Sequence, residues 1–312
     1  PVDNLDSFFR HLTGVKTIAA AEFTEPDFSA PPSDGADFSE IKGQERARRA
    51  MEIAAAGGHN ILMVGPPGTG KSMLAKRLPT IMPRMSFEES VEVTKIHSAS
   101  GTLDSESGLV TVRPFRSPHH TMSAPALVGG GAIPMPGEIS LASGGVLFLD
   151  ELPEFNKAVT ESMRQPLEDG FVTLSRVSGT VRYPSRFMLV CAMNPCRCGW
   201  YGHPSGRCTC TEAQVAQYQG KLSGPLLDRI DIRVDVPALS YDELEKRGSG
   251  ESSSVIRARV EAARKIARKR YLKHGIESNS QLPSQLIPEY CNLDDACSRL
   301  MKAAFDKLGL NR

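Results

Sequence analysis

Eight consecutive residues have the types and spacing of a phosphate-binding loop: Gly65, Pro66, Pro67, Gly68, Thr69, Gly70, Lys71 and Ser72. They match the pattern G-x-x-x-x-G-K-[ST] and lie between an apolar run, NILMV, and a segment typical of helices, MLAKRL. The glycines let consecutive backbone N–H groups point into one concavity, and the positive end of the following helix favours phosphate there. Lys71 would add a positive charge at the β- and γ-phosphates, and Ser72 is a candidate Mg²⁺ ligand.

Two acidic residues and an asparagine follow two other apolar runs. Asp150 and Glu151 come directly after VLFL, which predicts that Asp150 holds Mg²⁺ indirectly and that Glu151 activates an attacking water. Asn194 follows FMLVCAM, where an amide would orient that water, although an ordinary Asn-Pro turn explains the same residue. Arg229, in the segment GPLLDRID, is a candidate for stabilising charge at a γ-phosphate, and a solvated surface arginine is the alternative.

Four of the seven cysteines lie within fifteen residues, as the pairs Cys196-x-Cys198 and Cys208-x-Cys210. The start of the sequence has neither the basic nor the apolar region of a secretory signal, so the clustered thiols favour a metal over disulfides. Four thiols that converge tetrahedrally suit a structural Zn²⁺, and His203 is able to replace one of them. Reduced free thiols are the alternative, because C-x-C pairs are less diagnostic than C-x-x-C pairs.

The elements that must position these residues are predicted by the apolar runs themselves. NILMV, VLFL and FMLVCAM are short and continuous, which is typical of parallel strands buried on both faces of a sheet. Helix-forming segments before and after NILMV complete the opening of an α/β domain, predicted over residues 38–238. From residue 239 the composition becomes helical and charged, so residues 239–312 are expected to form a second, all-α domain. Residues 1–37 are predicted to be an N-terminal remnant, with a linker over residues 24–37.

Two segments between the strands have patterns of their own. FNKAVTESMRQPLEDG is predicted to be helical, and VTLSRVSGTVRYPSR alternates about Ser178-Gly179 like a β-hairpin.

The composition restricts the class of protein and the partners that it can have. The 312 residues, 40% hydrophobic and 23% charged, are typical of a folded globular protein. Because the net charge is only +1, no bulk positive field indicates a polyanionic partner, and any such contact must be local. No run approaches the roughly 20 apolar residues of a membrane span, and we expect a cytoplasmic protein without membrane contact. The start at Pro1 and the end at Arg312 suggest a piece of a longer chain.

Several longer segments carry a resemblance to a known family: IKGQERARRAMEIAAAGGHN, RPFRSPHHTMSAPALVGGG, PGEISLASGGVLFLDELPEF, RFMLVCAMNPCRCG and SGPLLDRID. With the phosphate-binding loop, they resemble the AAA+ ATPases, specifically the magnesium-chelatase-like YifB/ComM family, over about residues 38–310. The resemblance implies an α/β AAA+ P-loop core, with a parallel sheet flanked by helices, and an all-α lid, here truncated before its sensor 2 helix. It also implies that Asn194 is sensor 1, that Arg229 reaches a neighbouring subunit's nucleotide, and that Ile41 and Gln44 lie beside the adenine.

The same resemblance implies a homo-hexameric ring that binds ATP and Mg²⁺, hydrolyses ATP and acts on DNA, as in branch migration during natural transformation. In such rings the hairpin that carries Arg176, Arg182 and Arg186 faces the central pore, where arginines can contact phosphates; a solvated hairpin is the alternative. Two other functions stay open. One is a magnesium-chelatase-type ATPase that remodels a protein or metal-insertion complex, and the other is a nucleotide-binding assembly module without turnover.

Two small groups next to these motifs receive separate predictions. Adjacent His119 and His120 are expected to point apart and lack acidic partners at metal-site spacing, so we predict no metal or catalytic role for them. Arg113 and Arg116 form a small basic cluster that is compatible with a contact in the pore.

Overall fold

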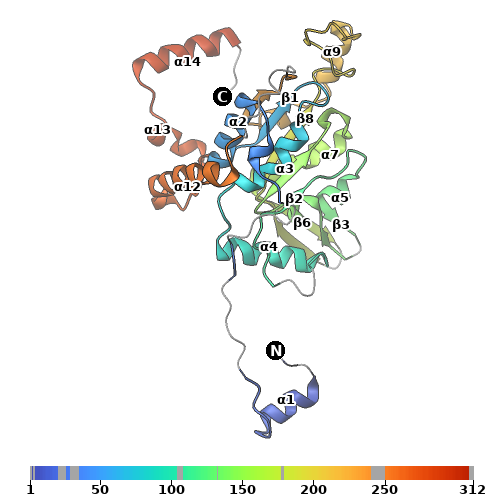
Figure 1. Ribbon diagram of the computed structural model, residues 1–312, viewed down its shortest axis with the longest axis vertical. Helices are drawn as coiled ribbons and strands as arrows, with labels where there is room; N and C mark the ends of the chain where they lie inside the picture. The colour runs from blue at the N-terminus through green and yellow to red at the C-terminus, as the bar shows by residue number, and fades with distance from the viewer. Residues whose placement is uncertain are drawn as a thin grey trace.

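The core of the protein is a five-stranded parallel β-sheet covered by helices on both faces (Figure 1). The computed structural model describes residues 2, 4–19, 26–28, 35–103, 108–131, 133–176, 179–239 and 250–308. The strand order is β2-β5-β8-β1-β9. The strands are β1 (Ile61–Val64), β2 (Phe115–Arg116), β5 (Val146–Leu149), β8 (Met188–Met193) and β9 (Ile232–Asp235). The three predicted strands are the three central ones, and every residue in them is buried, which confirms the expected parallel sheet.

Alternate residues of the strands feed two separate hydrophobic cores. Ile61 and Met63 of β1 face one core, which they share with α2 (Glu45–Gly57), α3 (Lys71–Ile81) and α12 (Ser253–Arg270). Leu62 and Val64 face the other core. Six short helices contribute to that second core: α5 (Ala124–Val128), α6 (Glu138–Leu141), α7 (Lys157–Ser162), α8 (Arg164–Asp169), α9 (Glu212–Gln219) and α10 (Gly224–Leu227). The sheet is thus held between two helical layers, and its carboxyl edge carries the loops described below.

Among the described residues, two small hairpins lie outside the central sheet. The predicted hairpin is confirmed as β6 (Phe171–Arg176) and β7 (Gly179–Pro184), which pair antiparallel. A second pair, β3 (Gly129–Gly130) and β4 (Met135–Pro136), follows α5, and α4 (Phe87–Ala99) lies beside the hairpins (Figure 1). The helix predicted over FNKAVTESMRQPLEDG is divided into α7 and α8, which meet at Met163. Much of the predicted linker lies outside the described residues.

The C-terminal part is helical, as expected. It comprises α12, three 3-10 turns, α13 (Ile287–Tyr290) and α14 (Asp295–Leu308). Ile256 and Val260 of α12 are buried against the first core. Two arginines of α12 donate to carbonyl oxygens of the neighbouring helices, Arg257 to Thr80 and Arg264 to Ala55, each at 2.8 Å. The basic side chains of α12 thus serve, in part, to dock it on the α/β core.

The two ends carry unburied helices. In α1 (Leu5–Leu12) no residue is buried, and α14 extends away from the sheet with Leu300, Met301 and Phe305 exposed (Figure 1). Among the described residues no helix is both long and apolar enough to cross a membrane.

Candidate functional site

The loop between β1 and α3 is shaped by its glycines. A Cβ atom at Gly65 would lie 2.1 Å from the carbonyl oxygen of Val236, so only glycine allows the loop to pack against the end of β9. Gly68 and Gly70 have φ values of 77° and 89°, the left-handed conformation that glycine adopts without strain. Gly70 is the N-cap of α3, so the loop leads straight into the positive end of that helix.

Lys71, the first residue of α3, points its ammonium group back into this loop. Its Nζ donates to the carbonyl oxygens of Gly65 and Pro66 at 2.7 and 2.8 Å, and to Oδ1 of Asn194 at 3.3 Å. Burial lowers the pKa of Lys71, and the charges of Asp150 and Glu151 act in the opposite direction. The cation predicted to contact phosphate is therefore held at the mouth of the loop.

Oxygen ligands suited to Mg²⁺ lie together at the end of β5. The hydroxyl of Ser72 donates to Oδ2 of Asp150 at 2.7 Å, and Oδ1 of Asp150 accepts from the backbone N–H of Glu151 at 2.9 Å. A hydroxyl and a carboxylate are hard oxygen donors of the kind that Mg²⁺ prefers, so the residues present fit the predicted ion. Glu151 has a φ of 52°, an uncommon conformation for a residue other than glycine, which turns the chain sharply after the strand.

Strand order explains why these residues meet. β8 lies between β5 and β1, and all three strands are parallel, so their carboxyl ends share one edge of the sheet. That edge carries the phosphate-binding loop, the acidic pair and Asn194. The acidic pair follows the loop by about 80 residues in sequence, and Asn194 follows it by about 120. Open α/β sheets bind ligands at this edge.

Ile41 and Gln44, predicted to lie beside the adenine, are both buried, and Gln44 contacts the loop. The Nε2 atom of Gln44 donates to the carbonyl oxygen of Pro237 at 2.7 Å and to that of Thr69 at 3.3 Å. Gln44 also has a left-handed backbone, with a φ of 52°. These contacts place Gln44 against both the phosphate-binding loop and the chain just after β9. A contact of Ile41 and Gln44 with the adenine stays a prediction.

Arg229 follows α10 and makes its ion pair with Glu168 of α8. Its carbonyl oxygen accepts from the side-chain amide of Asn60 at 2.8 Å, which fixes the backbone to the residue before β1. The Arg229 side chain is 41% exposed and so lies at the surface. The structure therefore places Arg229 beside Glu168, and a role at another subunit's nucleotide stays a prediction.

One neighbour of the acidic pair, His120, has no signature in the sequence. Nδ1 of His120 lies 3.5 Å from Oε2 of Glu151, and the imidazole packs edge-on against Phe155 with ring centroids 6.3 Å apart. The adjacent His119 contacts the hydroxyl of Thr121 at 2.9 Å. The two imidazole rings have centroids only 4.1 Å apart, so the expectation that they point apart is wrong. Only the fold brings residues 120 and 151 together, so no spacing rule in the sequence identifies this pair.

Arg113 and Arg116, the predicted basic cluster, both contact acidic side chains of the same chain. Arg113 donates to the carbonyl oxygen of Gly144 at 2.6 Å and forms an ion pair with Glu89. Arg116 forms a two-point ion pair with Glu138, with both N–O distances 2.6 Å. Carboxylates of the same chain thus pair with both guanidinium groups, and a contact of these side chains in a pore stays a prediction.

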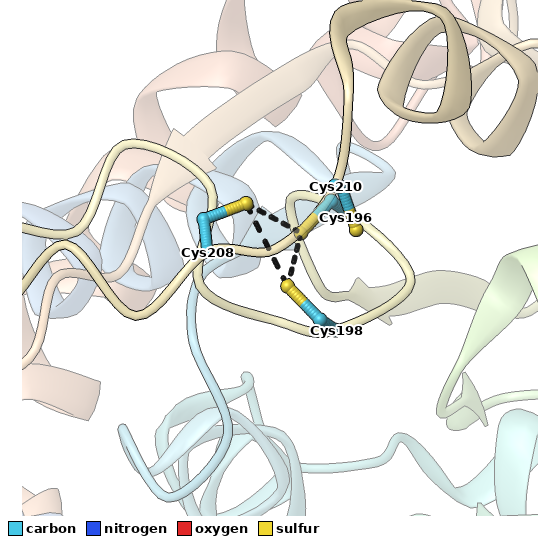
Figure 2. A group of neighbouring side chains, drawn as sticks. All are labelled: Cys196, Cys198, Cys208 and Cys210. Atoms are coloured by element: carbon cyan, nitrogen blue, oxygen red, sulfur yellow. Dashed lines mark hydrogen bonds between the residues drawn. The ribbon is translucent and has the colours of Figure 1, made fainter.

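The four clustered cysteines converge, as the spacing predicted (Figure 2). The Sγ atom of Cys196 lies 3.3 Å from that of Cys198 and 3.8 Å from that of Cys208, and all four sulfur atoms lie within 4.8 Å of one another. Backbone hydrogen bonds from Trp200 and Thr209 lower the pKa of Cys198 to about 6. The four sulfur atoms form a metal-compatible group, and zinc as its occupant stays a prediction.

The aromatic loop residues pack beside the cluster rather than joining it. The ring of His203 meets that of Trp200 edge-on, with centroids 5.1 Å apart, and its Nδ1 contacts the Ser205 hydroxyl at 2.7 Å. The guanidinium of Arg207 lies over the indole at 5.3 Å. His203 is therefore engaged elsewhere, and the described sulfur set needs no imidazole.

The sheet order, the phosphate-binding loop after β1 and the acidic pair after β5 together define the class: this is an AAA+ P-loop fold. Comparison with protein-family models identifies the family within this class. The model described as magnesium chelatase, subunit ChlI, matches residues 37–244, and the model of that subunit's C-terminal part matches residues 250–312. The chain belongs to this magnesium-chelatase-like family, in its YifB/ComM group.

Individual relatives support that placement. Competence protein ComM of Haemophilus influenzae is 45% identical over 277 residues, which is 88% of this chain and 53% of the relative. YifB of Escherichia coli is 45% identical over 276 residues, with the same coverage. An uncharacterized protein of Mycobacterium tuberculosis H37Rv is 43% identical over 304 residues, 97% of this chain and 59% of the relative. The chain thus spans between half and three-fifths of the length of these relatives.

A solved structure has the same fold. It is a complex between subunits BchI and BchD of magnesium chelatase, based on a single-particle cryo-EM reconstruction. The TM-score is 0.50 at 21% identity, and the match covers 76% of this chain and 74% of that one.

Proposed function

We propose that this chain is the Mg²⁺-dependent, ATP-hydrolysing core of an AAA+ ring motor that acts on DNA. The observation that carries the proposal is the arrangement at the carboxyl edge of the sheet, where Lys71, the Ser72–Asp150 pair, Glu151 and Asn194 lie together. ATP bound along the loop would place its γ-phosphate beside Lys71 and in front of Glu151.

Each residue has a distinct task in this reaction. The Glu151 carboxylate accepts a proton from the attacking water, and the Asn194 amide orients that water. Lys71 stabilises the negative charge that builds up on the γ-phosphate oxygens. Mg²⁺, which Ser72 and Asp150 would hold, supplies further neutralisation of phosphate charge when bound.

We expect His120→Ala to lower kcat for ATP hydrolysis about tenfold while changing the KM for ATP by no more than about twofold. The reason is that His120 lies against Glu151, so its loss frees the carboxylate to leave the productive position while the phosphate contacts remain. Steady-state hydrolysis measurements separate the two parameters. His119→Ala is the matched control, because its ring contacts Thr121. Equal losses in the two variants would show that His120 acts only through local packing.

A ring is supported by Arg229 and by the family. The arginine is exposed and lies after α10, where the family resemblance implies contact with the neighbouring subunit's nucleotide. The family resemblance also supports six copies of the chain in that ring. The same reasoning assigns residues 38–238 to an ATPase domain and residues 239–312 to a helical lid, a division that the two family matches, 37–244 and 250–312, support.

DNA as the substrate is supported by two weaker observations. Arg182 on β7 and Arg186, two residues after it, are both exposed, and exposed arginines are common partners of phosphate backbones. The relative from Haemophilus influenzae carries the name competence protein. The alternative, an ATPase of the chelatase type, is supported by the family model and by magnesium-chelatase 38 kDa subunits, such as that of Cereibacter sphaeroides, 25% identical over 215 residues.

The test is the rate of ATP hydrolysis with and without four-way-junction DNA at low salt. We expect a several-fold stimulation that declines steeply as salt rises, because phosphate contacts are lost with added salt, and that is absent in Lys71→Ala. Hydrolysis that ignores the junction would favour the chelatase-type alternative. A protein that binds ATP without hydrolysing it would instead be a nucleotide-dependent assembly module.

A further inference from the structure

The four sulfur atoms of the loop from Cys196 to Cys210 are spaced much as the ligands of a tetrahedral zinc ion would be. A tetrahedral zinc ion with Zn–S bonds of about 2.3 Å holds its sulfur ligands about 3.8 Å apart. Three of the sulfur separations here are 3.3, 3.6 and 3.8 Å, and the fourth sulfur lies within 4.8 Å of the others. Figure 2 shows sulfur atoms from both sides of the loop turned toward one centre. An ion there would join the two ends of a loop that contains neither helix nor strand.

One end of this loop follows a residue of the candidate nucleotide site, and the other end leads into α9, which contacts Pro195. Cys196 follows Asn194, whose amide oxygen accepts from Lys71, with only Pro195 between them. The carbonyl oxygen of Pro195 accepts from the side chain of Gln219 at 3.0 Å, and Gln219 is the last residue of α9. α9 begins two residues after Cys210. The sulfur cluster therefore lies next to both the connection to Asn194 and the connection to α9.

The middle of the loop packs directly on the phosphate-binding loop. A Cβ atom at Gly199 would lie 2.7 Å from Cδ of Pro67 and 3.9 Å from Cγ of Asn194. Gly199 also has a φ of 87°, which glycine alone adopts without strain. The backbone next to Cys198 therefore forms a wall against Pro67 and Asn194, and its position depends on what holds the loop in place.

We propose that a zinc ion bound by Cys196, Cys198, Cys208 and Cys210 clamps this wall against the phosphate-binding loop, so that zinc and ATP each strengthen the binding of the other. The inference rests on the proposed nucleotide site. Without the ion, the loop between β8 and α9 gains conformational freedom, and ordering it becomes part of the cost of binding ATP. Because such coupling is reciprocal, ATP must tighten zinc binding by the same factor.

The experiment compares the protein with and without zinc. Elemental mass spectrometry gives the zinc content, and titration with a fluorescent ATP analogue at fixed Mg²⁺ gives the nucleotide affinity before and after a zinc-selective pyridyl chelator. We expect one zinc per chain and an affinity about tenfold weaker after its removal, restored by added zinc. Circular dichroism before and after removal checks that the sheet and helices persist.

Three variants sharpen the result. Cys208→Ser is expected to lose zinc and to bind the ATP analogue about tenfold more weakly, whereas Cys291→Ser, an exposed cysteine outside the cluster, changes neither. Gly199→Ala keeps all four sulfur ligands but pushes against Pro67, so it is expected to retain zinc and to lose the effect of zinc on nucleotide affinity. This variant distinguishes a clamp from a site that only stabilises the fold.

The outcomes separate the two proposals. A protein that holds no zinc overturns the site, and one whose ATP affinity is the same with and without zinc overturns the clamp. A zinc-loaded protein that binds no ATP analogue at all overturns the proposed nucleotide site itself, and the coupling with it.

Discussion

Replacing Lys71 with alanine is expected to reduce ATP hydrolysis by at least about 100-fold, equivalent to about 2.7 kcal/mol of transition-state stabilisation. The ammonium lies at the mouth of the loop, where it contacts two carbonyl oxygens and Asn194, and no other described lysine shares those contacts. Alanine removes the charge that opposes the growing negative charge on the γ-phosphate. ATP binding should weaken as well, because the same charge contacts the bound phosphates.

The measurement is the hydrolysis rate at saturating ATP, together with a binding titration. Lys76→Ala is the matched control, since Lys76 is an exposed residue of the same helix. A Lys71 variant that retains more than about a tenth of the normal rate would show that this loop does not bind the reacting phosphates.

Replacing Glu151 with glutamine is expected to slow hydrolysis about 1,000-fold and to leave ATP binding intact, so that ATP stays bound without being hydrolysed. Glutamine has the same length and branching as glutamate, so it preserves the sharp turn after β5, but it cannot accept the proton of the attacking water. The Ser72–Asp150 contact, and with it the proposed Mg²⁺ site, is unchanged.

Single-turnover hydrolysis and retention of labelled ATP on the protein measure the two effects separately. Glu154→Gln provides the control, because Glu154 is a nearby exposed glutamate that forms an ion pair with Lys221. Normal hydrolysis by the Glu151 variant would remove this residue from the mechanism, and loss of ATP binding would show that it positions the nucleotide instead.

The sequence was sufficient to predict the central strands of the sheet but not the strands at its two edges. β1, β5 and β8 are continuous apolar runs because both of their faces are buried. β2 has only two residues, Phe115 and Arg116, and β9 alternates between intermediate and exposed positions, so neither has that signature. The strand order follows from tertiary pairing, which no local pattern in one sequence encodes.

The same division applies to the candidate site. The phosphate-binding loop and the cysteine pairs could be predicted because their residues are close in sequence and their chemistry restricts their spacing. The contacts of His120 with Glu151, of Arg229 with Glu168, and of Gly199 with Pro67 join residues 31 to 132 positions apart. Each contact depends on how loops at the sheet edge and the helices around it pack together.

The side chain of Gln44 connects the phosphate-binding loop to the chain that follows β9. A single amide bonds to Thr69 in the loop that receives phosphate and to Pro237, the second residue after β9 on the way to the helical C-terminal part. A displacement of the chain just after β9 would pull on the Pro237 carbonyl and, through the amide, on Thr69. Gln44 therefore links the two carbonyl groups, so the position of the chain after β9 and the shape of the phosphate-binding loop do not vary independently.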